Sequence, residues 1–187
     1  QKRDLRLCLE PFPAMAILSM LTRAIEARDP YTRGHSTRVT ALAELVALRL
    51  GWGEERLKSL RMGGRLHDIG KLAVPDAVLS KEGRLEADEL AQIQEHPKIG
   101  ARLILRIAAL RDAIPYVLYH HERWDGTGYP SGKAGEEIPV EARVLAVADA
   151  FDAMTSDRPY RPALSHDEAL AEVERGAGTQ FDPEIAR

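Results

Sequence analysis

The stretch Leu66-His67-Asp68-Ile69-Gly70-Lys71 places an imidazole and a carboxylate side by side at the end of an apolar helical stripe. Leu57, Leu60 and Gly64 form that stripe, with the three- to four-residue spacing of one helix face. The helix is expected to end at Gly70. A carboxylate on a buried face is costly unless a cation or strong hydrogen-bond donors meet it. The stretch therefore predicts a helix that carries a polar site into the core.

Helical periodicity of the same kind covers most of the chain, and strand signals are almost absent. The segment from Val140 to Met154 is apolar on nearly every side, which indicates a central buried helix. Ser165 and Glu168 form a capping box before a short final helix. Counted by stripes, the chain is an all-α bundle of about seven helices, at residues 15–25, 39–50, 57–70, 96–107, 114–121, 140–154 and 165–173.

Two connections between these helices stand out. Residues 75–86 join two helices and contain Lys81-Glu82-Gly83. Residues 122–139 are too glycine-rich for regular structure. A loop of this length in a compact domain is usually functional or disordered, so the second connection is a candidate part of a site.

Composition narrows the classes of function. The 187 residues are 44% hydrophobic and 29% charged, enough for the core of one domain, with or without an appendage. The net charge of −3 provides no global field that would attract DNA, RNA or an anionic membrane. The single cysteine, Cys8, excludes a disulfide framework and fits a reducing, cytoplasmic location. No apolar run is long enough to span a bilayer, and the start at Gln1 suggests a domain taken from a longer protein.

Histidines and aspartates occur on the predicted helices in a pattern that core packing does not explain. His67, His96 and His121 lie on apolar faces where leucine would be the ordinary residue. Asp149 lies inside the apolar run from Ala142 to Phe151. One such histidine is ordinarily a hydrogen-bonded core residue, but that explanation does not extend to five histidines and two aspartates.

Imidazoles and carboxylates that converge between helices make a metal site. Seven such groups are too many for one ion with open positions, whereas two ions about 3.5–4 Å apart would use them well. Asp68 is the natural bridge between two ions, because it directly follows His67. The sixth histidine, His166, is expected at the surface near a helix start. The seven candidate ligands are His35, His67, Asp68, His96, His120, His121 and Asp149.

Five motifs occur in the order and at the spacing of one protein family. They are Asp29-Pro30-Tyr31-Thr32-Arg33-Gly34-His35 with Arg38, Leu66 to Lys71, His96-Pro97 with Gly100, His120 to Pro130, and Ala148 to Arg161. Through them the chain from Asp29 to Phe181 resembles the HD-GYP family of metal-dependent phosphodiesterases. The resemblance implies an all-α HD-domain bundle with a glycine-rich GYP loop. It also implies a phosphodiesterase domain at 29–187, with 1–28 as an N-terminal helix or linker from a longer, regulated protein.

The same resemblance implies how the metals would be held. One metal would be held by His35, His67, Asp68 and Asp149, and the other by Asp68, His96, His120 and His121. Some family members carry a glutamate four residues before the first motif histidine, which supports a third metal. Tyr31 stands at that position here, so two divalent ions are expected. The family favours iron, manganese also fits, and the ligand set does not exclude zinc.

The resemblance implies a bacterial signalling hydrolase that cleaves cyclic di-GMP to pGpG, GMP or both. In this reading Asp68 and Lys71 are catalytic, and the substrate is bound by Lys71, Tyr129, Arg158 and Arg161. The residues alone leave other roles open. Lys71 could be a solvent-exposed lysine favoured by a helix end, Tyr129 could anchor a turn, and the two arginines could be ordinary surface residues.

Further expectations concern supporting residues and partners. Asp152, one turn from Asp149, is expected to orient a ligand histidine, and Asp125 is expected to fix the glycine-rich loop. The implied partners are a cyclic dinucleotide, an upstream sensory or receiver domain and a GGDEF-domain protein. A helix at residues 14–28 could pair with its copy in a homodimer or belong to the core.

Two other classes of function stay open. The first is a catalytically silent module that senses cyclic di-GMP or docks a GGDEF domain, which the retention of all seven candidate ligands disfavours. The second is another chemistry on the same scaffold, such as a di-iron oxygenase or a nucleotide phosphohydrolase. The GYP loop and Arg158-Pro159-Tyr160-Arg161 disfavour that class. Cyclic GMP-AMP stays open as an alternative cyclic substrate.

Overall fold

The structure is a computed structural model that describes residues 20–23, 26–28, 34–81, 83–157 and 162–187. From His35 onward this described part contains eight α-helices, three 3-10 helices and no strand, apart from an isolated bridge between Ala177 and Phe181. The all-α prediction is confirmed. The helices are α2 (His35–Arg49), α3 (Glu54–Leu66), η2 (Ile69–Ala73), α4 (Asp76–Leu79), α5 (Ala87–Gln94), α6 (His96–Leu105), η3 (Ala108–Ala113), α7 (Ile114–Tyr119), η4 (Gly135–Glu137), α8 (Val140–Thr155) and α9 (His166–Arg175).

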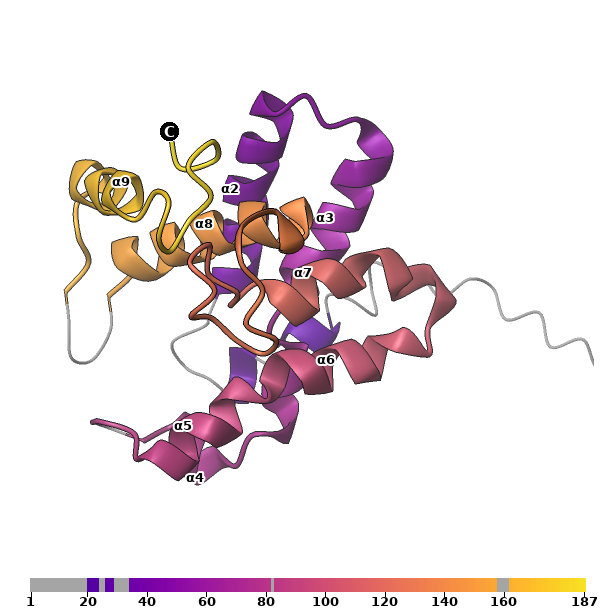
Figure 1. The fold of residues 1–187 in the computed structure, drawn as a ribbon. Coiled ribbons are helices and arrows are strands. Elements are labelled where there is room, and N and C mark those ends of the chain that lie inside the picture. Colours follow the sequence, from indigo (N-terminus) through magenta and orange to yellow (C-terminus); the bar gives the residue numbers. More distant parts are fainter. Residues whose placement is uncertain (1–19, 24–25, 29–33, 82, 158–161) are drawn as a thin grey trace, which may run out of the picture.

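Helix α8 is the central element of the bundle (Figure 1). It packs against α2, α7 and α9, and it buries Val144, Leu145 and Ala148 along with other residues. The prediction of a central buried helix at 140–154 is therefore confirmed. Figure 1 shows α2 and α3 as a contacting pair at one end of the molecule and α4 and α5 at the other. No helix in the described ranges is long and apolar enough to cross a membrane.

Two apolar clusters hold these helices together. The larger joins α2, α3, α7 and α8 through residues that include Val39, Leu60, Tyr116 and Leu145. The second joins the end of α3 to η2, α6 and α7 through residues that include Leu66. Each fully buried side chain of this size contributes about 1.5–3 kcal/mol relative to exposure. The clusters therefore hold in place the helix ends that carry the polar site.

A close approach of two backbones sets the distance between η2 and α6. A Cβ at Gly70 would lie 1.8 Å from the carbonyl oxygen of His96 and 2.7 Å from the backbone nitrogen of Gly100. No side chain fits in that space, so only glycine allows the contact at position 70. Asp68 directly precedes η2 and His96 begins α6, so this contact brings a candidate carboxylate ligand close to a candidate imidazole ligand.

Several predicted boundaries differ from the structure. Helix α3 ends at Leu66 rather than Gly70, and His67 and Asp68 form a turn before η2. Helix α7 ends at Tyr119, so the paired histidines follow it directly. Both helices were predicted to be too long because the apolar pattern continues past their ends, through turns that still bury every third or fourth residue.

The region between η2 and α6 contains two helices that the stripe count did not predict. Helix α4 interrupts the predicted connection at 75–86, and α5 follows it. None of the residues in α5 is buried, so this helix carries no strong apolar stripe. Its N-terminal signal was the capping box, in which Glu86 and Glu89 each bond to the backbone of the other.

The N-terminal segment packs against α3 and η2 where the structure describes it. Residues 20–23 and 26–28 are helical. The hydroxyl of Thr22 donates to the carbonyl of Arg65 at 3.1 Å. The Arg28 guanidinium donates to the carbonyls of Leu72 and Val74 and pairs with Asp76. The described part of the predicted 14–28 helix therefore packs on the segment that carries Lys71, and its remaining residues lie outside the described ranges.

Candidate metal centre and its cavity

The candidate ligands meet because helix ends meet. His35 and His96 are the first residues of α2 and α6, and His67 and His120 are the C-caps of α3 and α7. Asp149 alone lies well inside a helix, in the third turn of α8. Helix ends carry backbone groups without intrahelical partners, so they suit polar side chains. We call the seven side chains His35, His67, Asp68, His96, His120, His121 and Asp149 the ligand cluster.

Two groups within the ligand cluster are spaced closely enough to hold metal ions. In each group every residue offers a ligand atom within 4.8 Å of the others, and Asp68 belongs to both. The first group contains Asp68, His96, His120 and His121, and the second contains His35, His67 and Asp68. The arrangement therefore provides two neighbouring ion positions around one carboxylate.

Asp68 is the hub of these contacts. Its Oδ1 lies 3.2 Å from His96 Nε2 and 4.0 Å from His120 Nε2. Its Oδ2 lies 3.4 Å from His67 Nε2 and 2.8 Å from Lys71 Nζ. Burial raises the pKa of Asp68, but Lys71 and the surrounding imidazoles hold it well below its usual range. Asp68 is therefore an anion, the form in which a carboxylate binds metal.

Backbone carbonyls fix the orientation of three cluster histidines in the same way. Each Nδ1 bonds to the carbonyl oxygen three residues earlier: His67 to Gly64 at 2.8 Å, His96 to Ile93 at 2.7 Å and His120 to Val117 at 3.0 Å. A neutral imidazole that donates from Nδ1 carries its lone pair on Nε2. In neutral rings of His67 and His120 the Nε2 lone pairs therefore face Asp68, and Nε2 of His96 faces the same carboxylate.

These lone pairs fit a cation better than they fit each other. The buried Nε2 of His67 has no hydrogen-bond partner, and Nε2 of His96 and of His120 lie 3.3 Å apart. Buried acceptors without donors are unfavourable. Burial lowers the pKa of His67, of His120 and of His121, the last to about 4, so these rings are neutral. Imidazole and carboxylate together suit iron, manganese or zinc.

His35 lies between two carboxylates of α8. Its Nδ1 is 2.7 Å from Asp152 and its Nε2 is 3.2 Å from Asp149. Burial alone would lower the pKa of His35, but its bonds to the two carboxylates raise it to about 10. Arg38 also pairs with Asp152. The predicted contact between Asp152 and a candidate ligand histidine is present. Asp149 contacts His35, and His35 belongs to the second group of candidate ligands.

The ligand cluster opens into a cavity of about 700 Å³. This volume is within the usual range of about 300–1,000 Å³ for sites that take small molecules. Candidate site residues that line it are His35, Asp68, Lys71, His96, His120, His121, Tyr129 and Asp149. His67 lies behind this lining and is 1% exposed. Arg158, Arg161 and Tyr31 lie outside the described residues.

Tyr129 packs on a candidate ligand. Its ring stacks on His121 with centroids 4.7 Å apart and planes 28° from parallel, and its backbone N–H donates to the His121 carbonyl at 3.1 Å. Burial, together with Asp68 and Asp149, raises the pKa of Tyr129 above its usual value. The phenol is therefore neutral and lies beside the candidate metal positions.

Two acidic residues organise the glycine-rich loop at residues 122–139. Buried Glu122 accepts hydrogen bonds from the backbone nitrogens of Ser131 at 2.7 Å and of Lys133 at 3.1 Å. Asp125 accepts from Thr127 at 3.0 Å and pairs with Arg123, as expected for a residue that fixes the loop. Sequence reasoning did not single out Glu122, although its place directly after the paired histidines was a usable signal.

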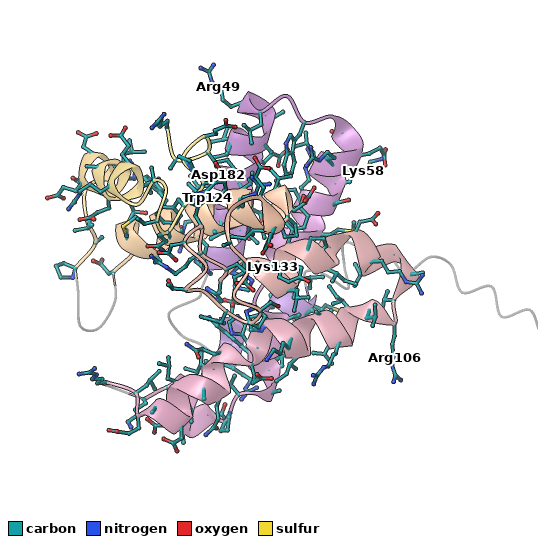
Figure 2. All side chains as sticks on the ribbon, viewed as in Figure 1. Arg49, Lys58, Arg106, Trp124, Lys133 and Asp182 are labelled. Carbon is teal, nitrogen blue, oxygen red and sulfur yellow. The ribbon has the colours of Figure 1, made fainter. Side chains whose placement is uncertain are left out.

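The C-terminal segment supports this loop from the other side. The backbone nitrogens of Trp124 and Asp125 donate to the carbonyls of Gln180 and Thr179 at 3.2 and 2.8 Å. Figure 2 shows Trp124 beside Asp182, where loop and C-terminal segment meet, with Lys133 of the same loop below them. The loop is therefore ordered around the cavity.

Comparison with known proteins places this architecture in a family. A family model described as HD domain matches residues 19–185. The chain belongs to the HD domain family, and its motifs place it in the HD-GYP group of that family.

Curated relatives share the same region. The chain is 46% identical over 173 residues to "Cyclic di-GMP phosphodiesterase response regulator RpfG" of Xanthomonas campestris pv. campestris (strain 8004), covering 89% of this chain and 44% of that protein. It is 39% identical over 176 residues to "Cyclic di-GMP phosphodiesterase" of Thermotoga maritima, covering 93% and 47%. It is 38% identical over 168 residues to "3'3'-cGAMP-specific phosphodiesterase 3" of Vibrio cholerae, covering 90% and 36%. The chain thus spans less than half the length of these relatives.

Solved structures share the fold. The cyclic GMP-AMP specific phosphodiesterase V-cGAP3 of V. cholerae superposes with a TM-score of 0.69 at 21% identity, over 91% of this chain and 46% of that one. Bd1817, described as an HDG"Y"P protein from Bdellovibrio bacteriovorus, superposes with a TM-score of 0.68 at 18% identity, over 92% and 60%. At these identities the likeness concerns the helical architecture alone.

Proposed function

We propose that this chain is a metal-dependent phosphodiesterase that hydrolyses cyclic di-GMP to pGpG, GMP or both. The observation that carries the proposal is that two groups of ligand atoms share Asp68 at one side of a cavity of about 700 Å³. Three relatives at 39–46% identity are named as cyclic di-GMP phosphodiesterases, which supports this choice of substrate. The chemistry would serve bacterial second-messenger signalling in the cytoplasm.

The ligand cluster would hold two divalent cations, with iron favoured, manganese as an alternative and zinc not excluded. Paired cations of this kind activate a water for attack on phosphorus and stabilise the charge on the attacking and leaving oxygens. In this arrangement the ligands of one cation would be His35, His67, Asp68 and Asp149. The ligands of the other would be Asp68, His96, His120 and His121.

The remaining chemistry belongs to residues beside the cluster. The carboxylate of Asp68 would position both cations, and Lys71, whose ammonium lies 2.8 Å from that carboxylate, would donate to a phosphate oxygen of the substrate. Tyr129, neutral and stacked on His121, offers an aromatic ring or a hydroxyl to the nucleotide. Arg158 and Arg161 stay predicted substrate contacts.

A second substrate has independent support. Three of the relatives are named as 3'3'-cGAMP-specific phosphodiesterases, with identities of 35–38%. Cyclic GMP-AMP has the same two phosphodiesters and differs in one base, so the ligand cluster would act on both. The choice between them depends on contacts to the bases.

The test is elemental analysis of anaerobically purified protein, coupled to an assay of cyclic di-GMP and cyclic GMP-AMP turnover. We expect about two metal ions per chain, as in two-metal hydrolytic sites, and release of pGpG or GMP. Metal-replete protein that binds cyclic di-GMP without turnover would instead establish the silent binding module. The full-length protein is needed to test the other proposed partners, which are a GGDEF-domain protein, an upstream sensory or receiver domain and a second copy in a homodimer.

A further inference from the structure

The cavity has a wall that the proposed mechanism does not use. Helix α4 and the connection that follows it line the cavity through Val78, Leu79, Lys81, Gly83 and Leu85. We call these five residues the α4–α5 wall. Helix α5 connects the wall to the ligand cluster along the chain, because α5 ends at Gln94 and α6 begins at His96.

Lys81 is the cation of the α4–α5 wall, and a carboxylate holds it in place. Its Nζ donates to Glu89 Oε2 at 2.6 Å. The same Oε2 accepts from the backbone nitrogen of Glu86 at 2.8 Å, so Lys81 is tied to the start of α5. The bond to Glu89 raises the pKa of Lys81, which therefore stays charged. An ammonium has three donors, and the Glu89 bond uses one of them.

The charge of the proposed substrate favours a second cationic contact. A cyclic dinucleotide carries two phosphodiesters, and the metal centre with Lys71 accounts for one. An anion removed from water without a partner is costly. Lysines and arginines in the described part of the cavity lining are Lys71, Lys81 and Arg123.

Arg123 is already part of the loop structure. Its guanidinium bonds to Asp125 at 3.2 and 2.7 Å and to Thr127 at 2.9 Å. These contacts fix the glycine-rich loop, whereas the Lys81 ammonium pairs with one carboxylate, that of Glu89. Of the described cations, Lys81 is therefore the better placed to meet a second phosphate.

We propose that Lys81, held by Glu89, binds the phosphate of the cyclic dinucleotide that is not being cleaved, with Val78 and Leu79 contacting the nucleotide beside it. The inference rests on the proposed function and adds a residue that distinguishes a cyclic dinucleotide from a simple phosphodiester. A substrate with one phosphate gains nothing from Lys81.

The test compares two substrates on metal-loaded protein: cyclic di-GMP, with two phosphates, and bis(p-nitrophenyl) phosphate, with one. In Lys81→Met we expect the ratio of kcat/KM for cyclic di-GMP to that for the simple diester to fall about 10- to 100-fold, the range for one lost hydrogen bond between charged groups. The loss should lie mainly in KM. Lys81→Arg, which keeps the charge, should retain most of the ratio.

The matched control is Lys58→Met. Lys58 pairs with Glu55 at the same 2.6 Å distance, and Figure 2 shows it at the periphery, away from the loop that carries Trp124 and Lys133. This variant should keep the wild-type ratio. Equal ratios in wild type and Lys81→Met would overturn the Lys81 assignment while leaving the proposed function intact. A wild type that cleaves the simple diester but no cyclic dinucleotide would overturn both.

Discussion

In the ligand cluster the backbone orients side chains, whereas in the glycine-rich loop side chains orient the backbone. The carbonyl oxygens of α3 and α7 accept from the Nδ1 atoms of His67 and His120. In the loop, the carboxylates of Glu122 and Asp125 accept from backbone nitrogens instead. Helices define the position of the candidate metal ligands, and a few acidic residues define the shape of the loop. Changes in the first region should therefore affect metal binding, and changes in the second should affect substrate affinity.

The largest effect is expected at the carboxylate that both ligand groups share. Asp68→Ala removes a contact from each candidate ion position, and His67→Ala removes one from the second group. Both variants should lose bound metal and all cyclic di-GMP turnover, measured by elemental analysis and product formation. His166→Ala, exposed at the start of α9, should leave both unchanged. Equal activity in the three variants would refute the role of the ligand cluster.

A smaller effect on metal binding is expected at Asp152, which bonds to a candidate ligand rather than to a metal position. Asp152→Asn replaces the carboxylate that bonds to His35 Nδ1 at 2.7 Å and should weaken metal affinity about 10- to 100-fold, the usual effect of such supporting partners. Titration calorimetry with Mn²⁺ measures this directly. Asp167→Asn, exposed on α9, is the control. Unchanged Mn²⁺ affinity in Asp152→Asn would mean that the Asp152 carboxylate does not position His35 for metal binding.

The contact between η2 and α6 can be tested through stability. Gly70→Ala forces a methyl group against the His96 carbonyl oxygen, which should cost about 1–3 kcal/mol. For a chain of this size that lowers Tm by roughly 2–10 °C, measured by calorimetry. Gly53→Ala, where the added Cβ meets nothing within 4 Å, should change Tm less. An unchanged Tm in Gly70→Ala would show that η2 and α6 can move apart to accept the methyl group without a loss of stability.

The smallest effect is expected in the loop. Asp125→Ala removes the partner of Arg123 and Thr127 and should raise KM for cyclic di-GMP by less than about fivefold, the range for one exposed ion pair. The kcat should change little, because no cluster ligand is lost. Glu136→Ala, exposed in the same loop, is the control. A loss of bound metal in Asp125→Ala would contradict the division between the two regions.

Buried polar residues made much of the site predictable from sequence. The histidines and aspartates stood out because they interrupt apolar faces, and the structure brings the seven together. Helix α8 was predictable because it is apolar on nearly every side. Helix α5 was not, because none of its residues is buried. Glu122 was missed because its partners, Ser131 and Lys133, come from a loop whose path no periodicity reveals.

The origin of the cluster residues in five separate helix segments has a consequence for folding. Their side chains come from α2, the α3–η2 turn, α6, the end of α7, and α8, so a cation held by them cross-links segments far apart in the chain. A ligand that binds only the native state raises the free energy of unfolding with its own concentration. The melting temperature of this domain should therefore report free metal directly, rising with added Mn²⁺ and falling with a chelator.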